Sequence, residues 1–132
     1  MSISIFITSY FDNYYLDKLI NDIIRQDYDN EKIELIIIDA GQNQEDRIKD
    51  ILSNSGIKLR YFFEKGMARI HALNKGFALA SNDLIVRLDA RSHIDENYLS
   101  SIEKLALEKD AAVICLVPEP SGTSSDGCST DR

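Results

Sequence analysis

The sequence has few cysteines and no long apolar run. Cys115 and Cys128 are its two cysteines, and a proline-containing stretch separates them. They form no Cys-x-x-Cys pair, so we expect neither a zinc site nor a disulfide framework, and this usage fits a reducing cytoplasm. The longest uninterrupted apolar run is residues 111–117, whereas a membrane-spanning helix needs about 20 residues. We therefore expect no membrane span in this chain.

The start of the chain lacks the marks of a signal peptide. Residues 1–7 contain no basic segment and no small-residue cleavage site. Ile3, Ile5 and Ile7 instead occupy every second position, which predicts a first strand.

Basic charge is scarce as well. Lys and Arg number 15 against 22 Asp and Glu, for a net charge of -7 and a pI near 4.7. This balance argues against a broad surface for polyanions, so nucleic acid is not an expected partner. The 132 residues are 44% hydrophobic and 28% charged, which is typical of one globular domain with a single core.

Strands and helices are predicted to alternate along the chain. Strands are expected at residues 3–7, 33–38, 57–63, 84–88 and 111–117, and helices at 16–24, 44–54, 67–80 and 94–108, with Asp12 or Asn13 capping the first helix. The nearly continuous apolar run at 33–38 is typical of a strand buried on both faces. The pattern predicts an α/β fold with a doubly wound, mostly parallel sheet.

The composition changes after residue 117. Residues 118–127 contain no large apolar side chain, so we expect a single domain over residues 1–117 and a disordered tail over residues 118–132.

Polar residues gather where the predicted strands end. They are Ser9, Tyr10 and Asp12 after the first strand, Asp39 and Gly41 after the second, and Asp89, Ala90 and Arg91 after the fourth. Ligands of open α/β sheets bind outside the carboxyl ends of the strands, where the winding direction changes. If these strands are neighbours, we expect the side chains to converge.

A small positive segment lies in the same region. Residues 66–92 include Arg69, Lys75, Arg87 and Arg91 and have a net charge of +2 in a chain of -7. Such a segment suits a phosphate-bearing small ligand, and scattered surface charge is the alternative interpretation.

Five sequence blocks carry a family resemblance. They are ISIFITSY at 3–10, QDY at 26–28, ELIIIDAG at 34–41, ALNKG at 72–76 and IVRLDAR at 85–91. In this order and at this spacing they resemble family-two glycosyltransferases of the GT-A type, over about residues 3–116. The resemblance implies a Rossmann-like GT-A fold, a nucleotide-diphosphate-sugar donor, a Mg or Mn ion, and inversion at the anomeric carbon.

The resemblance also implies roles for single residues. Ser9 and Tyr10 would line the nucleoside pocket, Asp39 would hydrogen-bond the base, commonly uracil, and Asp89 would be the first acid of a metal-binding Asp-x-Asp motif. The remaining members of the predicted nucleotide-sugar site are Gly41, Lys75 and Arg91. The implied acceptor is a saccharide or a lipid-linked acceptor, used in polysaccharide or glycan synthesis in the cytoplasm or, for the full-length protein, at the inner membrane face.

The sequence departs from the family pattern at three positions. Thr8 replaces the usual proline, Phe11 replaces an asparagine, and Arg91 replaces the second acid of Asp-x-Asp. The change at Arg91 bears most on metal binding. The arginine either neutralises phosphate itself or leaves His93 as a second ligand beside Asp89.

Structural interpretations stand beside these functional ones. The structural interpretation of Asp39 and Asp89 is that they are strand-end acids that form Asx turns. For His93 it is a surface or capping residue. Tyr10 fits rim packing.

No acid after Asp89 lies in a block matching the family's general base, so the catalytic residue stays unassigned and we expect this chain to be the donor-binding part of a transferase. A non-catalytic nucleotide- or partner-binding module of the same fold is the alternative. Residues 8–12 lack the glycines of a dinucleotide site, and Asp12 lacks the adjacent acid of a receiver domain.

Overall fold

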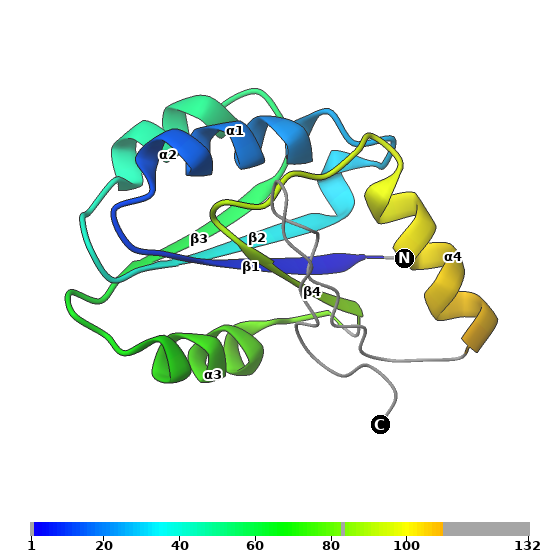
Figure 1. Cartoon of the computed structure of the whole chain (residues 1–132). Coiled ribbons are helices and arrows are strands. Elements are labelled where there is room, and N and C mark those ends of the chain that lie inside the picture. The colour runs from blue at the N-terminus through cyan, green and yellow to red at the C-terminus, as the bar shows by residue number, and fades with distance from the viewer. Residues whose placement is uncertain (1, 83, 110–132) are drawn as a thin grey trace.

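Figure 1 shows the chain as a computed structural model, which describes residues 2–82 and 84–109. The strand predicted over residues 111–117, the tail over 118–132, and both Cys115 and Cys128 lie outside the described residues. In the described part, no helix is both long enough and apolar enough to cross a membrane.

The described strands form a single parallel sheet. Their bounds are Ile3–Ser9 for β1, Ile33–Asp39 for β2, Lys58–Phe63 for β3 and Leu84–Asp89 for β4. The spatial order is β3-β2-β1-β4, and each neighbouring pair is parallel. The predicted α/β class with a parallel sheet is confirmed.

Helices cover both faces of this sheet. Their bounds are Asn13–Ile24 for α1, Glu45–Leu52 for α2, Arg69–Leu79 for α3 and Tyr98–Lys109 for α4, and a short 3-10 turn, η1, spans Asn30–Lys32. In Figure 1, α1 and α2 lie on one face and α3 lies on the other, while α4 lies near the N-terminus. This arrangement is the predicted double winding.

Strand alternation divides the core between these two faces. Ile3, Ile5 and Ile7 of β1 pack in the larger core with apolar residues of α1, α2 and α4. Phe6 points to the opposite face, where it packs in the smaller core with Ala72 of α3. All seven positions of β2 are buried, as its apolar run predicts for a strand covered on both faces.

The winding direction changes at β1. The chain leaves β1 through α1 toward β2 and continues through α2 to β3, all on one side of β1. It then crosses the opposite face through α3 and adds β4 on the free side of β1. The carboxyl ends of β1 and β4 therefore form the point at which an open α/β sheet has room for a ligand.

The helix predicted over 94–108 begins four residues later, at Tyr98. A buried side chain, Gln26, holds the segment before it: its amide nitrogen donates to the carbonyl of Asp95, and its amide oxygen accepts from the backbone N–H of Leu99 at 2.9 Å. These bonds keep residues 94–97 in a loop, although Ile94 is buried in the core.

A polar network fastens the amino ends of the strands. Glu34 of β2 is buried and accepts hydrogen bonds from the hydroxyl of Ser4 at 2.7 Å, from the N–H of Ser81 at 3.0 Å and from Arg60 at 3.2 Å. Burial alone would raise the pKa of Glu34, but these hydrogen bonds outweigh it and hold the pKa below its usual value. The polar side chains at this end of the sheet therefore satisfy one another's hydrogen bonds.

The closeness of α3 to the sheet depends on Gly76. A Cβ at this position would overlap the ring of Phe6, which also packs edge-to-face on Phe77 at 4.8 Å between ring centroids.

We expect Gly76→Ala to lower the free energy of unfolding by about 1–3 kcal/mol through overpacking, even though alanine favours helices. His71→Ala, on an exposed position of the same helix, is the control and should change stability by about 0.5 kcal/mol or less. Urea denaturation measures both, and a stabilised Gly76→Ala would contradict this packing.

Candidate functional site

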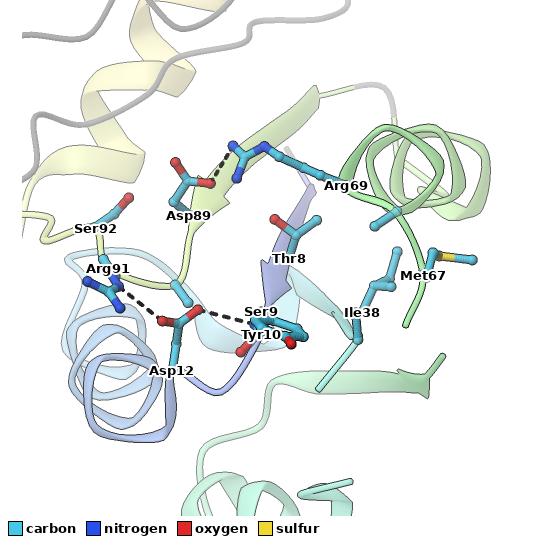
Figure 2. A pocket seen from close by; sticks show the side chains of 13 residues that line it. Thr8, Ser9, Tyr10, Asp12, Ile38, Met67, Arg69, Asp89, Arg91 and Ser92 are labelled. Carbon is cyan, nitrogen blue, oxygen red and sulfur yellow. Dashed lines mark hydrogen bonds and ion pairs between the residues drawn. The ribbon is translucent and has the colours of Figure 1, made fainter. Parts of the chain in front are cut away.

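A cavity of about 470 Å³ opens at the carboxyl ends of β1 and β4. Its lining residues are Thr8, Ser9, Tyr10 and Asp12 from the end of β1 and the following loop, Ile38 and Ala40 at the end of β2, Met67 just before α3, Arg69 and Ala72 from the first turn of α3, and Asp89, Ala90, Arg91 and Ser92 from the end of β4 and the following loop. Figure 2 shows these side chains arranged around the opening. The cavity thus lies at the point where the winding changes.

A row of three side chains crosses the sheet at the base of the cavity. Thr8 of β1 pairs in register with Ile38 of β2 and with Asp89 of β4. Their preceding neighbours in the strands, such as Ile7 and Leu88, belong to the core under α1 and α2. Because successive side chains of a strand point to opposite faces, the row faces α3 and places the cavity on that side of the sheet.

Ser9 contributes a hydroxyl that lacks a partner. The residue is 4% exposed and lines the cavity. Among the described residues, its Oγ has no hydrogen-bond partner. A buried polar atom without a partner carries a desolvation cost.

Tyr10 stands at the rim of the cavity. It is 62% exposed, and its ring packs edge-to-face on Phe11 with 4.8 Å between centroids. Phe11 itself has a positive φ of 54°, an unusual conformation for a bulky side chain. The pair forms an aromatic edge next to the buried hydroxyl of Ser9.

An ion pair joins the loop after β1 to the loop after β4. Asp12 is the N-cap residue of α1 by position, but its side chain does not cap the helix. The carboxylate instead accepts from the N–H of Tyr10 at 3.1 Å and from Nε of Arg91 at 3.0 Å. The guanidinium carbon of Arg91 also lies 4.8 Å from the ring centre of Tyr15. The expected capping bond is absent, and Asp12 holds the cavity wall instead.

A second ion pair spans the other side of the cavity. Nη2 of Arg69, the first residue of α3, donates to Oδ1 of Asp89 at 2.9 Å, and Figure 2 shows the contact beside Thr8. Both side chains are partly exposed, so the pair stabilises the fold by about 1 kcal/mol at most. The pair matters more for ligand binding, because the carboxylate of Asp89 already has a cationic partner.

Asp39 occupies a different environment from the one expected. It is fully buried, and its carboxylate accepts from the N–H groups of Gly41 at 2.9 Å and Gln42 at 3.1 Å, from the amide of Gln44 at 2.7 Å and from the hydroxyl of Tyr61 at 3.1 Å. Burial is the main cause that raises the pKa of Tyr61 to about 12, and the charge of Asp39 adds to it. Tyr61 therefore keeps its proton, and Asp39 organises the loop from β2 to α2.

Asp39 and Asp89 lie at the same edge of the sheet but on opposite faces. Ser9 pairs with Asp39 while Thr8 pairs with Asp89, and Asp39 is not among the residues that line the cavity. The neighbouring Ala40 lines it instead. The expected convergence therefore includes Asp89 and leaves Asp39 out.

Two further predicted site residues lie off the cavity. Gly41 lies against Phe11, and a Cβ at Gly41 would be 2.8 Å from the backbone nitrogen of Phe11. The two backbones can approach this closely only because residue 41 is a glycine. Lys75 of α3 forms an ion pair with Glu64 and lies over the ring of Phe62 at 4.8 Å. Neither Gly41 nor Lys75 lines the cavity.

The residues expected to hold a divalent cation do not fit one. The side chain of His93 is 74% exposed and its Nδ1 lies 3.0 Å from Asp22, away from the cavity lining. Asp89 is paired with Arg69. In the described ranges no three His, Cys, Asp or Glu side chains are grouped so that they could hold a metal ion. Mg²⁺ and Mn²⁺ prefer several oxygen ligands, and this donor set does not supply them.

Sequence reasoning missed part of the lining. Ile38, Ala40, Met67, Ala72 and Ser92 were not selected as site residues, although they line the cavity. Strand periodicity offered a signal for Ile38, because it shares a face with Thr8 and Asp89. The positive segment over residues 66–92 indicated Arg69 of α3, but no signal in the sequence singled out its neighbours Met67 and Ala72.

Comparison with known proteins gives a consistent family assignment. The sequence model described as Glycosyl transferase family 2 matches residues 4–130. An uncharacterized glycosyltransferase of Nostoc sp. is 32% identical over 92 residues, and the glycosyltransferase GlyG of Streptococcus pneumoniae is 28% identical over 115 residues. These alignments cover 68% and 85% of this chain.

Solved structures of glycosyltransferases share the fold. TarS of S. aureus in complex with UDP-GlcNAc superposes with a TM-score of 0.69 at 19% identity, over 82% of this chain. The mannosyltransferase PcManGT of Pyrobaculum calidifontis, in complex with GDP-Man and Mn²⁺, superposes with a TM-score of 0.59 at 20% identity, over 67% of this chain. The predicted GT-A fold is confirmed by this likeness.

The chain spans a minor part of each of these proteins. It covers 28% of the Nostoc relative and 37% of GlyG, and it covers 32% of the TarS chain and 27% of the PcManGT chain.

The burial of Asp39 generates a prediction on stability. We expect Asp39→Ala to lower the free energy of unfolding by about 3 kcal/mol or more, because four donors lose their acceptor at once and the side chain that is removed is fully buried. Asp50→Ala, an exposed aspartate of α2, is the matched control and should cost about 0.5 kcal/mol or less. Chemical denaturation of both variants measures the difference. An Asp39→Ala variant as stable as the control would show that the carboxylate does not organise this loop.

Proposed function

This chain belongs to glycosyl transferase family 2, and on that premise we propose that it binds a nucleotide-diphosphate-sugar donor as the donor-binding part of a glycosyltransferase. The family match, the relatives named glycosyltransferase and the GT-A fold support this proposal. The proposal specifies the class of donor and names no particular base or sugar.

One observation carries the proposal, namely the position of the cavity. It opens at the carboxyl ends of β1 and β4, where the winding changes, and its volume of about 470 Å³ is in the usual range for small-molecule sites. Cationic, acidic and apolar side chains share its lining, as a ligand with a charged middle and a less polar end requires.

The lining supports an orientation for the donor. Ser9 and Tyr10 lie on the β1 side, near the apolar Ile38 and Ala40, and suit the nucleoside end. Arg69 and Arg91 suit the diphosphate, because guanidinium groups donate paired hydrogen bonds to phosphate oxygens. The sugar would then point out of the cavity toward an acceptor.

The proposed reaction is a direct displacement with inversion. An acceptor hydroxyl forms a bond to the anomeric carbon while the bond from that carbon to the diphosphate oxygen breaks, and its electron pair leaves with the nucleoside diphosphate. A general base takes the proton of the hydroxyl. Both cavity carboxylates, Asp12 and Asp89, have arginine partners, so we assign this base to no described residue.

We further propose that the acceptor is a saccharide or a lipid-linked acceptor in polysaccharide or glycan synthesis. The cytoplasm is the proposed location, because Cys115 and Cys128 do not form a disulfide-type pattern in the sequence. The expected Mg or Mn ion is not carried into this proposal, since the cavity residues do not fit it.

A non-catalytic nucleotide-binding module is the second candidate function. The arginine partners of Asp12 and Asp89 favour it, because each carboxylate of the cavity is engaged in an ion pair. An assay of sugar transfer or donor hydrolysis by the protein at its full natural length separates the two candidates, since the module binds donors but turns over none.

Two buried serines of β1 provide a matched test of the site. Ser9→Ala removes a hydroxyl that has no partner among the described residues, so the free energy of unfolding should change by about 0.5 kcal/mol or less. Loss of its hydrogen bond to the donor should weaken nucleotide-sugar binding about three- to tenfold. Calorimetric titration of UDP- and GDP-sugars and urea denaturation provide the two measurements.

Ser4→Ala is the control with the opposite expectation. Its hydroxyl donates to Glu34 at 2.7 Å and accepts from the N–H of Asn82 at 3.1 Å, at the far end of the sheet. We expect a loss of about 1–3 kcal/mol in stability and unchanged affinity for the donor. Equal affinities of Ser9→Ala and the unaltered protein would refute the placement of the donor beside Ser9.

A further inference from the structure

Two arginines from separate elements line the cavity at the place proposed for the diphosphate. Arg69 begins α3, and Arg91 follows β4 at the position where the family resemblance implies an acid. Figure 2 shows them on either side of Asp89, each directed toward a carboxylate of the cavity wall. Their charge lies where a metal ion would otherwise supply it.

Both guanidinium groups keep donors available. Arg91 uses Nε for Asp12, and Arg69 uses Nη2 for Asp89. A guanidinium has five N–H groups, and the remaining ones form no hydrogen bond to the described residues. Each side chain is at least 60% exposed, so a phosphate can reach these donors without breaking either ion pair.

The arginines are also held in position. The ring of Tyr15 lies under the guanidinium of Arg91, with 4.8 Å between the guanidinium carbon and the ring centre. The carboxylate of Asp12 that binds Arg91 is itself fixed by the N–H of Tyr10. Positioned charge costs less entropy on binding than a free side chain, which favours a role beyond solvation.

The same charges disfavour a divalent cation. Asp12 and Asp89 are the acids among the lining residues, and each lies within 3.0 Å of an arginine nitrogen. A cation placed between them would meet two fixed positive charges in addition to the loss of both ion pairs. A diphosphate meets those same charges as attraction.

The first turn of α3 adds to this preference. Its N-cap residue is Ala68, whose side chain provides no capping hydrogen bond. The first N–H groups of a helix have no partner within the helix, and the helix dipole makes this end positive. Met67 and Arg69 on either side of Ala68 line the cavity, so the positive end of α3 opens onto it.

We propose that Arg69 and Arg91 neutralise the diphosphate of the donor and that this chain binds nucleoside diphosphates without a divalent cation. The inference rests on the proposed function and specifies how the site recognises its ligand. When the bond from the anomeric carbon to the diphosphate oxygen breaks, the electron pair moves onto that oxygen, and the two guanidinium groups stabilise the added charge. The proton of the acceptor hydroxyl goes to a base, as in the proposed reaction.

The test is calorimetric titration of UDP and of GDP into the protein at its full natural length. Each titration is carried out once with excess chelator and once with excess MnCl₂. We expect the dissociation constant of the nucleotide that binds to agree within about twofold between the two conditions, since no cation contributes. Arg69→Ala and Arg91→Ala should each weaken binding in chelator by about ten- to a hundredfold, because each removes charge-assisted hydrogen bonds.

Two variants sharpen the result. Arg91→Lys keeps the charge but loses the paired donors, so its affinity should fall between that of Arg91→Ala and that of the unaltered protein. Lys58→Ala removes an exposed positive charge at the start of β3, at the opposite end of the sheet, and should leave binding unchanged. Thermal melting of every variant verifies that the fold persists.

The outcomes distinguish this inference from the proposed function. Binding that requires manganese would overturn the inference and leave the donor-binding function standing. Binding in chelator that neither arginine variant weakens would also overturn it. If neither nucleotide binds in either condition, the proposed function itself fails. Equal binding in both conditions, with losses confined to the two arginines, supports the inference.

Discussion

The hydrogen bonding of β1 on both of its edges is the constraint on which the rest of the structure depends. Because β2 pairs with one edge of β1 and β4 with the other, both in parallel, the loops that follow β1 and β4 lie side by side at the carboxyl edge of the sheet. The space between them is the cavity. It exists because of the strand order and not because of any single side chain, which is why a chain that is 19% identical to TarS keeps the same arrangement of elements.

Side-chain alternation then decides which residues the cavity receives. Thr8, Ile38 and Asp89 share one row and one face of the sheet. Asp39 is displaced from that row by a single residue, and its carboxylate is consumed by four hydrogen bonds within the loop that follows β2. Two acids that look equivalent in the sequence thus do different work: one organises the scaffold, and the other belongs to the wall of the site.

The sequence sufficed to predict the parallel α/β sheet, because the apolar run of β2 and the helical spacing of α1 are local patterns. It also located the edge of the sheet at which the cavity opens, since strand ends can be counted. The same counting predicts the face on which Asp39 lies, because Ile37 and Asp39 are two residues apart in β2 and point to the same face of the sheet. The ion pair of Asp12 with Arg91 could not be predicted from the sequence, because it joins positions 79 residues apart. The late start of α4 could not be predicted either, because it depends on a hydrogen bond that the side chain of Gln26 accepts from the backbone N–H of Leu99.

Arginine at the place of an acid gives the cavity its chemical character, with Arg69 and Arg91 supplying positive charge next to the carboxylates of Asp12 and Asp89. The most direct measurement is a crystal structure of the protein at its full natural length with a nucleoside diphosphate and manganese, in which anomalous scattering locates the ion. The account predicts the nucleotide in the cavity beside Ser9, its phosphates on both guanidinium groups, and no manganese at Asp89. A manganese ion bridging Asp89 and the phosphates, or a nucleotide bound elsewhere, would contradict it.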